Sequence, residues 1–129
     1  MIRFTTNKSL DELARDLEAA TNDHGFGVLA VHDLRAKMAA KGVPFDRPCQ
    51  VFEVCNPEKA KAVLTQDMAI STVLPCRISV YATDAGDQLE LATLEPTAVL
   101  SMFNRPELEP EAREVEDTLR SIMAQAAED

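Results

Sequence analysis

The chain is poor in aromatic residues, glycine and long apolar runs. It has no tryptophan, one tyrosine and four glycines among its 129 residues. Its longest apolar run, residues 26–31, is far too short to cross a lipid bilayer. The first residues also lack the apolar core of a secretion signal. We therefore expect no association with membranes.

Cysteine is scarce as well. The three cysteines, Cys49, Cys55 and Cys76, are an odd and small number for the disulfide framework of an exported protein. Free thiols in a reducing compartment are the simplest interpretation, so we expect a cytoplasmic protein.

Basic residues are outnumbered by acidic ones, 13 against 22, and the formal net charge is −9. A surface of this sign repels phosphate backbones, and no cluster of lysine and arginine interrupts it. The sequence therefore predicts no nucleic-acid partner. The acidity is otherwise typical of a soluble protein and assigns no chemistry.

Signature motifs of known reactions are missing. The chain has no phosphate-binding loop, dinucleotide fingerprint, HExxH metal motif or nucleophile–base–orienter pattern. This absence does not exclude an enzyme, but it leaves no reaction to name. We therefore predict no cofactor and favour a non-catalytic protein.

Apolar residues make up 46% of the chain, which is enough for the core of one domain over residues 1–129. Apolar periodicity and turn residues predict the order β-α-β-α-β-α-β-β-α-α. Strands are expected at residues 2–5, 26–32, 49–55, 76–83 and 88–94, and helices at residues 9–24, 34–41, 57–66, 96–103 and 109–127. The hairpin of the last two strands cannot occur in an all-parallel sheet. The sequence thus predicts a two-layer α+β fold, with a mixed or antiparallel sheet and helices packed on one face.

Two helix starts carry clear signals. Ser9 is followed three residues later by Glu12, which is the pattern of a capping box. Asn56 and Pro57 suit the cap and the first position of the helix that follows the third strand.

Several short motifs occur in an informative order and spacing. They are Gly25-Phe26-Gly27-Val28, His32-Asp33-Leu34, Lys41-Gly42, Cys55-Asn56-Pro57 with Ala60 and Leu64, and Leu74-Pro75-Cys76 with Val80-Tyr81, followed by the terminal helix. Together they resemble the domain of unknown function 302 family over most of the chain. The resemblance implies a curved antiparallel sheet gripped by helices, similar to TATA-box-binding-protein-like folds, often as a homodimer and without DNA binding. It supplies no catalytic residues, because none is established for the family.

Cys55 and Cys76 stand at strand ends and are candidates for metal or redox chemistry. Cys55 precedes a helix N-terminus, which favours a thiolate, so a redox pair or a soft-metal site completed by His32 is one hypothesis. Unpaired cysteine is, however, usually a buried apolar residue, and no CxxC spacing is present. If Phe52 and Val54 face the helices, strand alternation also places Cys55 on the face opposite Cys76. The two thiols are therefore separate candidates rather than a pair.

Four polar residues define a candidate ligand-binding cleft: Glu53, Arg77, Tyr81 and His32. Arg77 and Tyr81 share one face of a hairpin strand, and Glu53 lies mid-strand among apolar neighbours. His32 ends a strand and can serve as an acid–base group or a metal ligand. The same residues are equally expected on the solvent-exposed face of a sheet that is covered on one side only.

Two apolar segments, residues 68–74 and 99–103, are too short or too irregular to bury their own side chains. Either can seal a pocket, pack beneath the sheet or form a dimer interface, and intramolecular packing is the default expectation. For the homodimer contact we favour residues 99–103, together with the final helix.

The leading functional hypothesis is a cytoplasmic homodimer that binds a small-molecule ligand or a protein partner without catalysis. The alternative is a thiol-based metal-binding or redox protein that uses Cys55 and Cys76 with His32. Acid–base catalysis through Glu53 and His32 is a third hypothesis.

Overall fold

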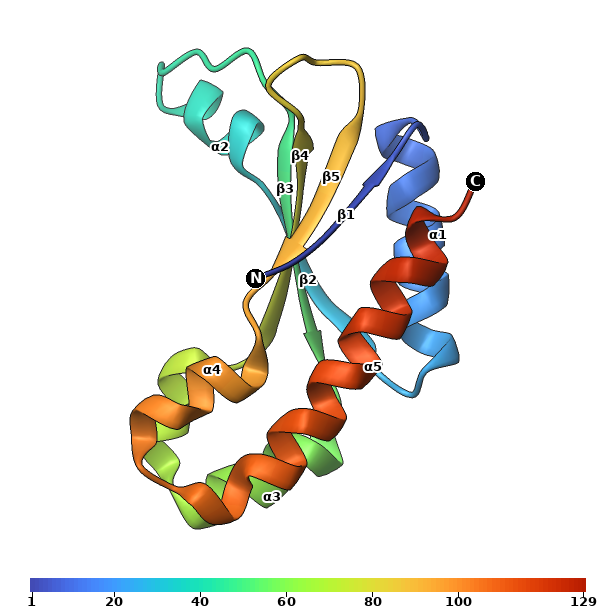
Figure 1. The fold of residues 1–129 in the computed structure, drawn as a ribbon. Helices are drawn as coiled ribbons and strands as arrows, with labels where there is room; N and C mark the ends of the chain where they lie inside the picture. The colour runs from blue at the N-terminus through green and yellow to red at the C-terminus, as the bar shows by residue number, and fades with distance from the viewer.

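The computed structural model describes all 129 residues and contains one five-stranded antiparallel sheet (Figure 1). The strands lie in the order β1-β5-β4-β3-β2, so β1 and β2 form the two edges. Their bounds are β1 Ile2–Thr6, β2 Gly27–Asp33, β3 Cys49–Cys55, β4 Cys76–Ala82 and β5 Leu89–Thr93. The predicted α+β fold is confirmed, and every neighbouring pair of strands is antiparallel.

The chain also forms five α-helices and three 3₁₀ helices, of which α1, α2, α3 and η1 connect strands and the others follow β5. The α-helices are α1 (Leu10–Asp23), α2 (Leu34–Ala40), α3 (Pro57–Gln66), α4 (Pro96–Leu100) and α5 (Glu109–Ala127). The 3₁₀ helices are η1 (Met68–Val73), η2 (Ser101–Phe103) and η3 (Pro106–Leu108). Residues 68–74 were expected to be an irregular loop, but most of them form η1, whose first turn is capped by Asp67. None of the helices is both long and apolar enough to cross a membrane.

Side-chain alternation assigns each strand residue to one face of the sheet. The register between β3 and β4 pairs Phe52 with Ile78 and places Val54 across from Cys76. Phe52, Val54 and Ile78 are buried in a core of fifteen residues that includes Leu91 of β5. A one-residue slip of either strand would turn these side chains toward water, so burial fixes the register.

Helices α1 and α5 lie side by side and cover the buried face of the sheet (Figure 1). Each helix contributes one apolar stripe to the core: Leu13, Leu17 and Ala20 from α1, and Leu119, Ile122, Met123 and Ala126 from α5. Within each helix these residues recur at helical spacing, so they lie on the side that faces the sheet. At the start of α1, the Ser9 hydroxyl accepts a 3.2 Å hydrogen bond from the Glu12 amide, as the capping pattern predicts.

The opposite face of the sheet is largely open, with α2 at its margin (Figure 1). Asp33 ends β2 and begins α2, because its carboxylate accepts a 2.9 Å hydrogen bond from the Ala36 amide. The helix therefore starts directly beside the strand that it follows.

Helices α3 and α4 and the first part of α5 gather beyond one end of the sheet (Figure 1). Their second, smaller core contains Val63, Ile70 and Leu108. The buried Glu116 of α5 fixes α4 in place, since its carboxylate accepts hydrogen bonds from the Thr97 amide at 3.1 Å and the Thr97 hydroxyl at 2.7 Å. This carboxylate accepts hydrogen bonds at the N-terminus of α4, whose own cap residue, Glu95, makes no side-chain hydrogen bond to the amides of the helix.

Asn56 caps α3 by accepting hydrogen bonds from the amides of Glu58 and Lys59. Asn56→Ala removes both bonds and should lower the free energy of unfolding by about 1 kcal/mol. Chemical denaturation followed by circular dichroism measures the change. Asn22→Ala is the matched control, because Asn22 is exposed on α1 and its side chain makes no hydrogen bond. An equal effect of the two substitutions would contradict the capping role.

Candidate functional site

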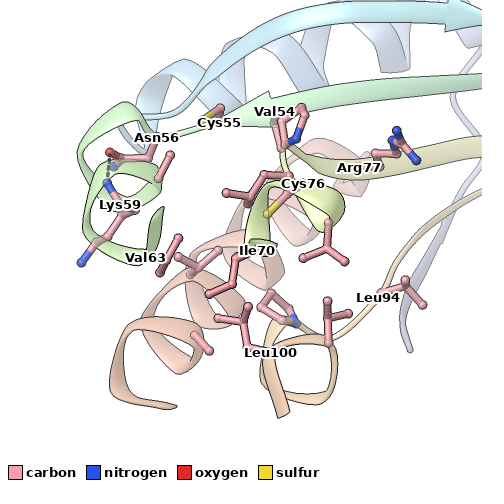
Figure 2. A pocket seen from close by; sticks show the side chains of 18 of the residues that line it. Val54, Cys55, Asn56, Lys59, Val63, Ile70, Cys76, Arg77, Leu94 and Leu100 are labelled. Atoms are coloured by element: carbon pink, nitrogen blue, oxygen red, sulfur yellow. Dashed lines mark hydrogen bonds between the residues drawn. The ribbon is translucent and has the colours of Figure 1, made fainter. Parts of the chain in front are cut away.

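A cavity lies beyond the ends of β3 and β4, bounded by α3, η1, α4 and α5 (Figure 2). Its volume is about 270 Å³, and 15 of its 23 lining residues are hydrophobic. Val63, Ile70 and Leu100 line it from α3, η1 and α4 (Figure 2). The lining residues therefore come from segments that are far apart in the sequence.

Three junctions in the chain build this cavity. Asn56 and Pro57 begin α3 directly after β3, and the chain returns to β4 through η1 and a cis Leu74–Pro75 bond. Pro96 begins α4 shortly after β5, at the same end of the sheet. Because these elements leave the same end of the sheet, their apolar residues surround a space that the sheet itself cannot fill.

Cys76 directs its thiol into the cavity (Figure 2). Burial, and to a lesser extent the neighbouring Cys55, raises the pKa of Cys76 from 9.0 to about 11. The thiol is therefore protonated at neutral pH. It presents the cavity with a soft, weakly polar surface instead of a charge.

The cations that border the cavity point away from it. The amine of Lys59 and the guanidinium of Arg77 are both directed outward (Figure 2). Lys59 is held by Glu111 at 3.2 Å and by Glu114 at 2.6 Å. No unpaired charge is thus directed into the cavity.

The two strand-end thiols, Cys55 and Cys76, do not face each other. Since the register places Val54 across from Cys76, Cys55 belongs to the opposite face of the sheet, as strand alternation predicts. Cys55 borders the cavity where β3 ends and α3 begins (Figure 2). All three cysteines are free, and no group of three or more histidine, cysteine or acidic side chains is arranged to hold a metal ion.

His32 and Glu53, two of the four predicted cleft residues, meet on the open face of the sheet. His32 Nε2 lies 2.6 Å from Glu53 Oε1, across the β2–β3 pair. His32 Nδ1 lies 2.7 Å from Nζ of Lys37 on α2. The side chains of His32 and Glu53 are 33% and 19% exposed. Lys37, His32 and Glu53 thus form one continuous hydrogen-bonded array.

Arg77 and Tyr81 share the open face but do not join this array. Arg77 lies across from Glu53 in the register, yet the Glu53 carboxylate pairs with His32 instead. Tyr81 donates its hydroxyl hydrogen bond to Glu90 of β5, and this bond raises the pKa of the tyrosine. The four predicted residues therefore share a surface without converging on one point.

The sequence gives little indication of the contact between Lys37 and His32 or of the cavity. Lys37 follows His32 by five positions, and only the placement of α2 beside the sheet brings the two together. The cavity had one signal, the apolar segments 68–74 and 99–103, for which sealing a pocket was among the open interpretations. Ile70 and Leu100 come from these segments, and both line the cavity.

Comparison with known proteins finds one matching family and a similar solved structure. The model of a family described as a domain of unknown function, DUF302, matches residues 2–126. A similar solved structure is that of an uncharacterized conserved DUF302 protein from Bacillus stearothermophilus, which is 29% identical. The similarity covers 98% of each of the two chains, with a TM-score of 0.89. No curated protein matches the chain.

Cys76 should react slowly with alkylating agents, because only the thiolate attacks them. With a pKa of about 11 in place of the ordinary 9.0, its thiolate fraction continues to increase as the pH is raised well above 9.0. Alkylation by iodoacetamide, followed at Cys76 by peptide mass spectrometry across this pH range, should give a midpoint near the raised value. Glutathione in the same reaction is the control for an exposed thiol. Equal midpoints for Cys76 and glutathione would contradict burial of the Cys76 thiol in the cavity wall.

Proposed function

This chain belongs to the DUF302 family, and we propose that it is a non-catalytic binding module for a small, uncharged and largely apolar molecule. The proposed site is the cavity beside Cys76. One observation carries the proposal: a space of about 270 Å³ with a mostly hydrophobic lining, inside a small domain. Packed protein interiors do not ordinarily leave such a volume, which is large compared with a water molecule.

The volume limits the size of the ligand. Apolar cavities of about 150 Å³ stay dry and take up benzene, whereas pockets for drug-sized ligands begin near roughly 300 Å³. The present cavity, at about 270 Å³, lies between these two cases. Its ligand therefore has the size of one or two fused rings or of a short branched chain.

The side chains at the rim of the cavity also favour an apolar ligand. Leu94 and Met102 line the cavity and are also exposed to solvent, Met102 to 68%. Exposed apolar side chains beside an apolar cavity provide contacts for a ligand that extends beyond the opening. Methionine adapts to ligands of different shape. We therefore expect selection by size and polarity more than by one functional group.

The thiol-based alternative has less support. The register separates Cys55 from Cys76 by a sheet face, and a disulfide requires both side chains to approach each other directly. His32, the third member of the suggested site, is hydrogen-bonded to Glu53 and lies near Lys37 instead. Non-covalent binding needs no rearrangement of these strands.

We also propose that the module acts as a cytoplasmic homodimer, in a compartment that keeps its three free thiols reduced. Edge strand β2 offers a better contact for this dimer than residues 99–103. Leu29 and Val31 of β2 are 62% and 48% exposed, and no lysine or proline protects this edge. Two copies of β2 related by a two-fold axis can pair in antiparallel fashion and bury these side chains. Leu100 and Phe103, by contrast, pack against the small core.

Toluene is a probe of suitable size and polarity for the cavity. Dilute toluene should raise the unfolding temperature of the protein, because a ligand that binds only the folded state stabilises it. Ala60→Leu, which places a larger side chain in the cavity lining, should abolish the rise. Ala36→Leu on the exposed surface of α2 is the matched control, and toluene should still raise the unfolding temperature of this variant. The proposal fails if toluene has no effect on the wild-type chain, or the same effect on Ala60→Leu.

Light scattering on a size-exclusion column should give the mass of a dimer for the wild-type chain. Leu29→Lys together with Val31→Lys introduces charge at the β2 edge and should yield a monomer. Met68→Lys is the control, since Met68 is exposed on η1 and is not part of this edge. A wild-type monomer would refute the dimer. A monomer produced by Met102→Lys, with no effect at β2, would place the interface at residues 99–103.

A further inference from the structure

The array formed by Lys37, His32 and Glu53 lies on the open face of the sheet, apart from the cavity, and the proposed binding function does not use it. We propose that it is a nucleophile–base–orienter relay in which Lys37 captures small aldehydes as a Schiff base. The reactive atom is Nζ of Lys37, which lies 2.7 Å from His32 Nδ1. These contacts have the spacing at which a base activates a nucleophile while a third group orients the base.

The hydrogen-bonding capacity of the three groups fixes the tautomer of His32. An ammonium group has donors only, so Nδ1 must accept the hydrogen bond from Lys37. The imidazole proton is therefore on Nε2, where it is donated to Oε1 of Glu53 at 2.6 Å. This arrangement leaves a lone pair, and not a proton, directed at the lysine.

The two supporting groups are held by the sheet, whereas the amine is accessible. Glu53 lies on β3, in the interior of the sheet, and its side chain is only 19% exposed. His32 lies on the neighbouring strand β2 and is 33% exposed. Lys37 is exposed on α2, so an aldehyde reaches it without opening the fold. A rigid base below an accessible nucleophile is the arrangement that amine catalysis needs.

Lys37 also differs from the other four lysines of the chain. Lys8 pairs with Asp16, and Lys59 pairs with Glu111 and Glu114. Lys41 and Lys61 are exposed and have no base beside them. In a chain with a net charge of −9, Lys37 donates to an imidazole in place of a carboxylate.

The reaction balances without an oxidant or reductant. His32 Nδ1 takes one proton from Lys37, and Glu53 stabilises the imidazolium that results. The neutral amine forms a bond to the carbonyl carbon, while the carbonyl oxygen receives the proton back from His32. The nitrogen of this carbinolamine still carries the positive charge, so loss of water gives the protonated imine. Leu34, one helical turn before Lys37 and partly exposed, provides an apolar contact for the aldehyde chain.

The test measures which lysine of the intact protein reacts. Butyraldehyde and cyanoborohydride are added at neutral pH, so that each imine is trapped as a secondary amine, and peptide mass spectrometry follows all five lysines. Lys37 should be modified about tenfold or more faster than Lys41 and Lys61, because general-base assistance is worth at least this factor. Equal rates for the three lysines would overturn the proposal.

Two variants separate the relay from simple exposure. His32→Gln removes the base and should bring Lys37 to the rate of Lys41 and Lys61. Glu53→Gln keeps the size of the side chain but removes the charge that stabilises the imidazolium, and it should lower the Lys37 rate severalfold. Thermal unfolding confirms that each variant is folded. A Lys37 rate that survives both substitutions would refute the relay, because the excess reactivity would then come from exposure alone.

Discussion

The register between β3 and β4 is the constraint on which the rest of this structure depends. Burial of Phe52 and Ile78 beneath α1 and α5 determines how the two strands align. With that alignment, Cys76 lies on the face that carries the helices and borders the cavity, whereas Glu53 lies on the open face. The position of both candidate sites therefore follows from the packing of a few apolar side chains that belong to neither.

Both sites begin where a strand passes into a capped helix. Asp33 ends β2 and caps α2, which carries Lys37 back toward the strand. Asn56 follows β3 and caps α3, which forms one wall of the cavity. In each case the cap sets the direction in which the helix leaves the sheet. A local hydrogen bond thus decides which surface the following side chains can reach.

Local signals in the sequence were sufficient to predict the elements of this fold but not their assembly. The caps at Ser9 and Asn56 predicted helix starts correctly, because each cap depends on residues within one turn. Alternation likewise separated Cys55 from Cys76. The apolar segments 68–74 and 99–103 indicated that a pocket could be sealed, but not where it lies, because α4 is held by a carboxylate of Glu116, nineteen residues after Thr97. The contact between Lys37 and His32 depends in the same way on where α2 lies relative to the sheet.

The two cores of the chain differ greatly in size, and the side of the cavity formed by α3, η1 and α4 belongs to the smaller one. Fifteen buried residues join the sheet to α1 and α5, whereas only Val63, Ile70 and Leu108 form the core beside the cavity. Substitutions at sites that share no contacts act almost independently on stability. Residues of α3, η1 and α4 can therefore change, and reshape the cavity, while the sheet and its two long helices keep the domain folded. Ligand preference and fold can thus diverge at different rates within one chain.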